Sequence, residues 1–142
     1  MRERRVLHFA YGANLDSREM ARRCPTAVKS SKGTLNGYRF LINSRGVATV
    51  VPDGKSRVEG LLWSLSREDE NRLDYFEGVP DYYQKQYLEV LPSIGRPVSA
   101  LVYVAIDSVP GKPREGYLDK IIKNARYLGF PTKYISQLES LR

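Results

Sequence analysis

The segment from Val6 to Leu15 joins an apolar, strand-like run to a turn of small residues around Gly12. Asp16 and Glu19 follow at once with the spacing of a helix capping box. A turn between a strand and a helix leaves several backbone N–H groups without partners, and glycine lets a ligand approach the backbone closely. The pattern therefore predicts a pocket for an anionic group such as a carboxylate.

Glu77 lies in the last turn of a helix that the sequence predicts to end at Gly78. The helix macrodipole and the apolar neighbours both disfavour a negative charge there, so we expect a raised pKa for this carboxyl. Leu73, four residues earlier on the same face, favours an inward orientation. A carboxyl group whose pKa is near neutrality suits a general base. The alternative is an exposed glutamate at a helix end.

Tyrosines are the other candidate pocket residues, and the chain has 10 of them. Tyr82 and Tyr83 begin a predicted strand, and Tyr117 begins a long C-terminal helix. Because a buried phenol needs a polar partner, Tyr117 suits either the core or a pocket. His8 lies inside the first predicted strand, where we expect a packed or hydrogen-bonded imidazole.

The chain has few nucleophiles and metal ligands, with His8 its single histidine and Cys24 its single cysteine. This excludes an intramolecular disulfide framework and makes a Ser-His-Asp triad, a Cys-His pair or a zinc site unexpected. No Walker loop or dinucleotide fingerprint is present. We therefore expect no metal and no cofactor, and chemistry carried by carboxylates, tyrosines and backbone donors.

Strands in the middle of the chain and helices at its end must position these groups. Apolar patterns and breakers predict strands near 5–11, 27–42, 47–51, 57–65, 83–91 and 98–105. Caps and periodicity predict helices near 17–24, from a Ser66 cap to Glu77, from Tyr117 to about Leu128, and a short last helix that Thr132 can cap. Several links between strands are too short for helical crossovers, which favours an α+β fold with a mixed or antiparallel sheet that can close.

Length and composition are those of a soluble globular chain, and we expect a single domain over residues 1–142. No apolar stretch is long enough to cross a membrane and no signal peptide is recognisable, so we expect a cytoplasmic location. The net charge of +7 raises nucleic acid as a partner. The basic residues are dispersed, however, and the group formed by Arg18, Arg22 and Arg23 is best interpreted as a solvated helix face.

Five separated motifs together resemble the gamma-glutamylcyclotransferase-like superfamily, and the resemblance covers nearly the whole chain. They are Tyr11-Gly12-Ala13-Asn14-Leu15, Val58-Glu59-Gly60-Leu61-Leu62-Trp63, Leu73-Asp74-x-x-Glu77-Gly78, Tyr83 followed by Lys85, and Tyr117-x-x-x-Ile121 ahead of Gly129-x-Pro131-x-x-Tyr134. Each motif alone is weak, whereas their order and spacing are specific. The resemblance implies a small mixed β-barrel flanked by α-helices.

The resemblance also implies a reaction, the release of the γ-glutamyl group of a dipeptide or amine conjugate as 5-oxoproline. The family's carboxylate-binding loop corresponds to Tyr11, Gly12, Ala13, Asn14 and Leu15, its catalytic glutamate to Glu77, and two pocket tyrosines to Tyr83 and Tyr117. Ala13 stands where the family often has serine, so the loop keeps its backbone donor but lacks a hydroxyl. The substrate implied is a small γ-glutamyl compound, without metal or covalent intermediate.

Three alternatives stay open on sequence alone. The same pocket can serve another acyl group or reaction, such as a hydrolase. It can be a non-catalytic binding module for a small anionic ligand, although Glu77 disfavours this. A basic nucleic-acid-binding protein is the least favoured alternative. The sequence leaves open the leaving group and whether the chain is a monomer or a homodimer.

Overall fold

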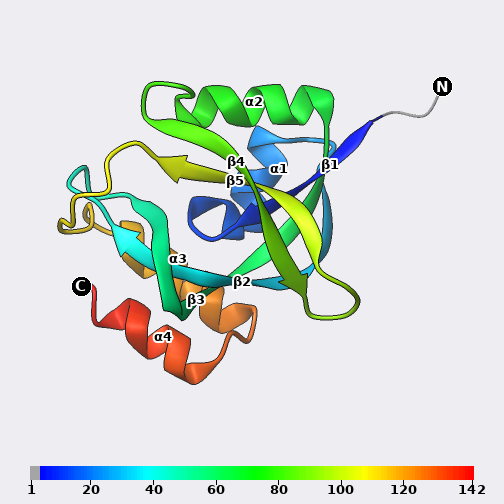
Figure 1. Ribbon diagram of the computed structural model, residues 1–142. Coiled ribbons are helices and arrows are strands. Elements are labelled where there is room, and N and C mark those ends of the chain that lie inside the picture. Colours follow the sequence, from blue (N-terminus) through cyan, green and yellow to red (C-terminus); the bar gives the residue numbers. More distant parts are fainter. Residues whose placement is uncertain (1–3) are drawn as a thin grey trace.

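Five strands close into a barrel in the computed structural model, which describes residues 4–142 (Figure 1). They are β1 (Arg5–Ala10), β2 (Val28–Ile42), β3 (Ala48–Ser66), β4 (Tyr83–Pro92) and β5 (Val98–Ala105). Their order around the barrel is β1-β3-β2-β4-β5. The parallel pairing of β1 with β5, at His8 and Leu101, closes the barrel, and the other four pairings are antiparallel. The expected α+β fold with a small mixed barrel is confirmed.

Helices cover both ends of this barrel (Figure 1). They are a 3-10 turn, η1 (Ala13–Leu15), and the α-helices α1 (Ser17–Arg23), α2 (Arg67–Glu77), α3 (Tyr117–Tyr127) and α4 (Thr132–Glu139). In Figure 1, α2 lies along one end, whereas α3 and α4 lie together at the other. None of the helices within residues 4–142 is long and apolar enough to span a membrane.

The longest strand differs from the sequence-based expectation, which placed separate strands near 47–51 and 57–65. The structure joins them into β3, which pairs with β2 along most of its length. Pro52 and Gly54 are residue types that often end a strand, but here the strand continues through a bulge. Tyr38 pairs with Pro52 and Asn36 pairs with Arg57, so residues 53–56 have no paired partner in β2. Both faces of this strand are buried over residues 58–63.

Two details at helix ends also differ from expectation. The turn after β1 is itself helical, because η1 lies between the strand and α1. Pro131, not Thr132, occupies the N-cap position of α4, and no side chain caps this helix. The predicted ends of α2 are confirmed, since Ser66 accepts a hydrogen bond from the Asp69 N–H and Gly78 adopts a left-handed conformation.

Candidate active site

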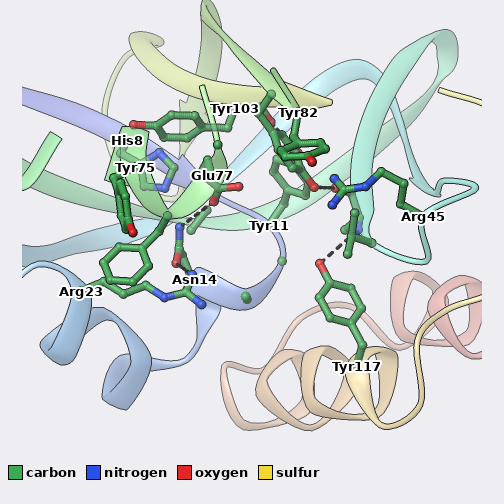
Figure 2. A pocket seen from close by; sticks show the side chains of 18 of the residues that line it. His8, Tyr11, Asn14, Arg23, Arg45, Tyr75, Glu77, Tyr82, Tyr103 and Tyr117 are labelled. Carbon is green, nitrogen blue, oxygen red and sulfur yellow. Dashed lines mark hydrogen bonds between the residues drawn. The ribbon is translucent and has the colours of Figure 1, made fainter. Parts of the chain in front are cut away.

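A cavity of about 450 Å³ opens where the loop after β1, the end of α2 and the start of α3 meet (Figure 2). Seven of the eight residues assigned to the site on sequence grounds line it, namely Tyr11, Gly12, Ala13, Asn14, Glu77, Tyr83 and Tyr117. The eighth, Leu15, does not line the cavity, because its side chain is buried in the core. The fold thus brings together residues from three distant segments of the chain, 11–14, 77–83 and 117.

The loop from Gly12 to Asn14 presents backbone donors to this cavity. Leu15 and Asp16 donate their N–H groups back to Gly12 and Ala13, which forms the η1 turn. The N–H groups of Gly12, Ala13 and Asn14 have no acceptor among residues 4–142. The first N–H groups of a helical turn have no partner within it, and they favour an anion.

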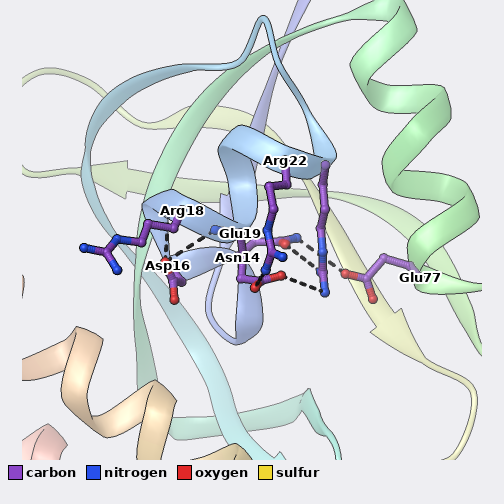
Figure 3. A network of polar contacts seen from close by, with 7 residues as sticks. Asn14, Asp16, Arg18, Glu19, Arg22 and Glu77 are labelled. Atoms are coloured by element: carbon purple, nitrogen blue, oxygen red, sulfur yellow. Dashed lines mark hydrogen bonds and ion pairs between the residues drawn. The ribbon is translucent and has the colours of Figure 1, made fainter.

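The loop is held from outside by its neighbours. Asp16 caps α1 by accepting from the N–H groups of Arg18 and Glu19, as the capping-box spacing predicts (Figure 3). The Glu19 carboxylate does not complete the box; it pairs with arginines of its own helix. The indole N–H of Trp63 donates to the Asn14 carbonyl oxygen at 3.2 Å. The loop is therefore a fixed element before any ligand arrives.

Glu77 is placed at the cavity by the way α2 ends. Gly78 ends the helix with its N–H and that of Val79 directed to the carbonyl oxygens of Tyr75 and Asp74. Leu73, one turn earlier, is fully buried and orients this face of α2 toward the barrel. Figure 2 shows the Glu77 carboxyl group in the middle of the labelled pocket side chains.

Burial raises the pKa of Glu77 to about 7, in the direction expected. Two groups oppose this shift: the Arg23 guanidinium and a long hydrogen bond of 3.5 Å from the Asn14 side-chain amide. Arg23 also donates to the Asn14 side-chain oxygen at 3.0 Å, so that Asn14 links the arginine to the carboxyl group. The carboxyl group can thus gain and lose a proton near neutral pH.

Two buried hydroxyl groups contact the backbone of Ala48 across the cavity. Tyr83 donates to the Ala48 carbonyl oxygen at 2.7 Å, and Tyr117 accepts from the Ala48 N–H at 3.0 Å. Burial raises the pKa of Tyr117 to about 12, so its hydroxyl stays protonated. The proton of that hydroxyl has no acceptor within residues 4–142 and is available to a ligand.

Tyr82 and Tyr83 have different places in the site. Tyr83 is buried, whereas Tyr82 is half exposed at the rim, and both residues line the cavity. The Arg45 guanidinium lies 3.9 Å from the centre of the Tyr82 ring. Arg45 comes from the turn between β2 and β3, and sequence analysis did not assign it to the site.

Other residues at the cavity were also missed. Arg23, Arg114, Tyr75, Phe76 and Tyr103 line it. Arg23 was interpreted only as part of a basic helix face. Its position at the end of α1, the helix that follows the loop, could have indicated that it lies near the cavity. Arg114 lies in the connection before α3, and nothing in its local sequence indicates that it reaches the cavity.

His8 lies in the cavity wall, as a buried and hydrogen-bonded residue. Its Nδ1 is 3.0 Å from the Leu101 carbonyl oxygen, which makes Nδ1 the protonated nitrogen. Burial lowers the pKa of His8 to about 4, so the imidazole is neutral at neutral pH. Within the described part of the chain, no cluster of His, Cys, Asp or Glu has the size and spacing to hold a metal ion.

Comparison with known proteins gives a family that matches most of the chain. The model of the family described as gamma-glutamyl cyclotransferase, AIG2-like, matches residues 8–127. The gamma-glutamylcyclotransferase of Homo sapiens is 25% identical over 150 residues, covering 98% of this chain and 80% of the relative. That of Bos taurus is 27% identical over 148 residues, covering 95% and 78%.

The fold agrees with the same family. A solved structure described as a gamma-glutamyl cyclotransferase superposes with a TM-score of 0.89 at 24% identity, over 98% of this chain and 89% of the other. A crystal structure of an uncharacterized human protein superposes with a TM-score of 0.88 at 25% identity, over 99% and 89%.

Proposed function

This chain belongs to the gamma-glutamyl cyclotransferase, AIG2-like family, and from that premise we propose that it releases the γ-glutamyl group of a small γ-glutamyl compound as 5-oxoproline. The observation that carries the proposal is a half-buried carboxyl group, Glu77, whose pKa is raised to about 7 within a cavity bordered by unpartnered backbone donors. That arrangement supports the proposal, because a group that can accept a proton lies beside donors that can bind an anion.

In the proposed complex, the loop N–H groups of Gly12, Ala13 and Asn14 bind the α-carboxylate of the substrate. This binding places the adjacent α-ammonium group near Glu77, which accepts one of its protons. The free amine then attacks the γ-carbonyl carbon of the same molecule. Because nucleophile and electrophile belong to one molecule, holding it in a folded shape supplies much of the rate.

The second half of the reaction breaks the original amide bond. A bond forms between the α-nitrogen and the γ-carbon, and the bond from that carbon to the leaving nitrogen breaks. Glu77 returns its proton to the leaving nitrogen, while the α-nitrogen loses a second proton to water as it becomes the lactam N–H. In this proposal the Tyr117 hydroxyl, whose proton has no acceptor within residues 4–142, donates to the oxygen of the tetrahedral intermediate.

The experiment is to incubate the purified protein with a panel of γ-glutamyl amino acids and γ-glutamylamines and to measure released 5-oxoproline. Glu77→Gln is the key variant, because it keeps the shape of the side chain and removes its basicity. The proposal requires product with the wild type and a loss of at least about 100-fold in kcat with Glu77→Gln. Glutamate in place of 5-oxoproline would instead indicate a hydrolase.

A further inference from the structure

A cluster of charged and polar side chains attaches the last turns of α2 to the barrel. The Asp74 carboxylate accepts from the Tyr103 hydroxyl at 2.7 Å through one oxygen and from the Lys85 ammonium at 3.0 Å through the other. Lys85 also pairs with Glu70, one turn earlier in α2, at 2.5 Å. The strands β4 and β5 thus each contribute one donor to the same carboxylate of α2.

The helix itself does not account for an aspartate at position 74. Asp74 lies in the last turn of α2, where the helix macrodipole disfavours a negative charge, and this turn contains no basic residue. Its pair with Lys85 is sheltered, since both side chains are 27% exposed, whereas Glu68 and Arg72 of the same helix form a pair that is 79% and 48% exposed. Exposed pairs contribute little to a fixed geometry, and a sheltered carboxylate with two donors contributes more.

Asp74 holds the end of the helix that carries Glu77. The Asp74 carbonyl oxygen accepts from the Val79 N–H at 3.0 Å, a bond that closes the helix around Gly78. Glu77 lies three residues after Asp74, which is about one helical turn. The side chain of Asp74 is therefore fixed to the barrel and its carbonyl to the chain beyond Glu77, so that the turn carrying Glu77 is held at both ends.

Tyr103 also connects this helix end to the anion-binding loop. Its carbonyl oxygen accepts from the hydroxyl of Tyr11, the first residue of the loop, at 2.5 Å. Its ring lines the cavity, and Figure 2 shows it close to Glu77. The proposed reaction needs a fixed separation between loop and carboxyl group, because the loop binds the α-carboxylate and Glu77 accepts a proton from the adjacent ammonium group.

Resting on the proposed function, we propose that Asp74, held by Lys85 and Tyr103, is a positioning residue that keeps the Glu77 carboxyl group buried in the cavity and at a fixed distance from the loop. Neither Asp74 nor Lys85 lines the cavity. Lys85 can therefore be replaced without removing a contact to the substrate, and any effect on Glu77 must pass through α2 or through the change of charge.

The pKa of Glu77 distinguishes these two ways of acting. Loss of the Lys85 cation by its charge alone raises the pKa of a nearby carboxyl group. Loss of the position of Glu77 lowers it, because burial is the main cause that raises this pKa to about 7. The groups that interact with Glu77 across the cavity are unchanged by a substitution of Lys85, namely Arg23, Asn14 and the phenols of Tyr11, Tyr83, Tyr103 and Tyr117.

The test is a ¹³C NMR titration of the Glu77 carboxyl carbon in the wild type and in Lys85→Met, with Glu77→Gln to assign the signal. We expect the midpoint in Lys85→Met to fall by at least about half a pH unit, and kcat for 5-oxoproline release to fall by about tenfold with KM within about twofold. Tyr103→Phe, which changes no charge, should lower the midpoint as well. Lys85→Arg should keep kcat within about twofold. A midpoint in Lys85→Met that is unchanged or higher overturns the proposal.

Two controls separate positioning from charge and from general stability. Arg72→Met removes the same charge from the exposed face of α2 and should leave the midpoint unchanged. Leu138→Ala opens the core at α4, away from the cavity, and should lower stability without moving the midpoint. A midpoint lowered equally by Leu138→Ala and Lys85→Met also overturns the proposal. If no substrate yields 5-oxoproline, the proposed function fails, whereas the titration needs no substrate and still decides the role of Asp74 and Lys85.

Discussion

Glu77 shows which properties of a side chain can be predicted from its own place in the sequence. Its position before Gly78 and next to apolar neighbours predicted a raised pKa, and burial raises it to about 7. The opposing effects of Arg23 and Asn14 were not predictable, because they depend on a contact between α1 and α2. The sequence identifies the Glu77 carboxyl group and the direction of its pKa shift. How far Arg23 and Asn14 oppose that shift can be learned only from the folded structure.

The first prediction concerns the pH dependence of activity. Since Glu77 must be ionised to accept a proton, kcat/KM should fall by about tenfold per pH unit below a midpoint of about 7. Arg23→Gln removes the cation that lowers the pKa of Glu77, so the midpoint should move to higher pH. Arg22→Gln, on the exposed face of the same helix, is the control. Equal midpoints in all three proteins would contradict this role of Arg23.

The second prediction concerns stability and follows from the same pKa. A carboxyl whose pKa is higher in the folded state stabilises the fold when protonated, and that contribution is lost as pH rises from about 4.5 to about 7. Above pH 7, Glu77→Gln should therefore raise the free energy of unfolding, by about 1–2 kcal/mol once solvent in the cavity is allowed for. At pH 4 the variant and the wild type should be nearly equal. Urea denaturation at both pH values tests this, and a variant less stable at pH 8 would contradict it.

At the scale of elements, periodicity and caps predicted the helix α2 and strands β4 and β5 closely. The joining of two predicted segments into β3 was missed, because Pro52 and Gly54 are locally indistinguishable from a turn. Only pairing with β2 shows that residues 53–56 bulge and return to the ladder. Arg45 was missed for a related reason, since the turn that presents it is held by contacts with Arg114, which is distant in sequence.

The third prediction concerns the packing of β3 against β1. A methyl group at Gly60 would collide with the Ala10 carbonyl oxygen and the Phe9 ring, both in the strand that leads to the loop. Gly60→Ala should lower the free energy of unfolding by about 2 kcal/mol or more, as overpacking against backbone does. Gly54→Ala is the matched control, because nothing lies within 4 Å of the added atom, and we expect a change within about 0.5 kcal/mol. Equal urea midpoints for the two variants would contradict this account.

At the scale of the whole molecule, the fold shows where part of the net charge of +7 is concentrated. Sequence alone could not say whether dispersed arginines are a solvated surface or a binding site. The fold gathers Arg23, Arg45 and Arg114 at one cavity from three separate segments. This concentrates positive potential where an anionic small molecule would enter.

The fourth prediction concerns salt. γ-Glutamylalanine carries two carboxylates and one ammonium group, whereas γ-glutamylethylamide has one of each. Raising NaCl from about 20 to about 500 mM should lower kcat/KM for γ-glutamylalanine by roughly threefold through screening, with little change for the ethylamide. Identical salt dependence of the two substrates would contradict electrostatic guidance by the arginine-lined rim.

The most direct test of the central claim is the product balance of γ-glutamylalanine turnover by wild type and Glu77→Gln. Our account predicts equal amounts of 5-oxoproline and alanine from the wild type, no glutamate, and no more than about a hundredth of that rate from Glu77→Gln with unchanged binding of the substrate. Full 5-oxoproline release by Glu77→Gln would contradict the role of Glu77. Glutamate as the wild-type product would contradict the proposed cyclisation itself.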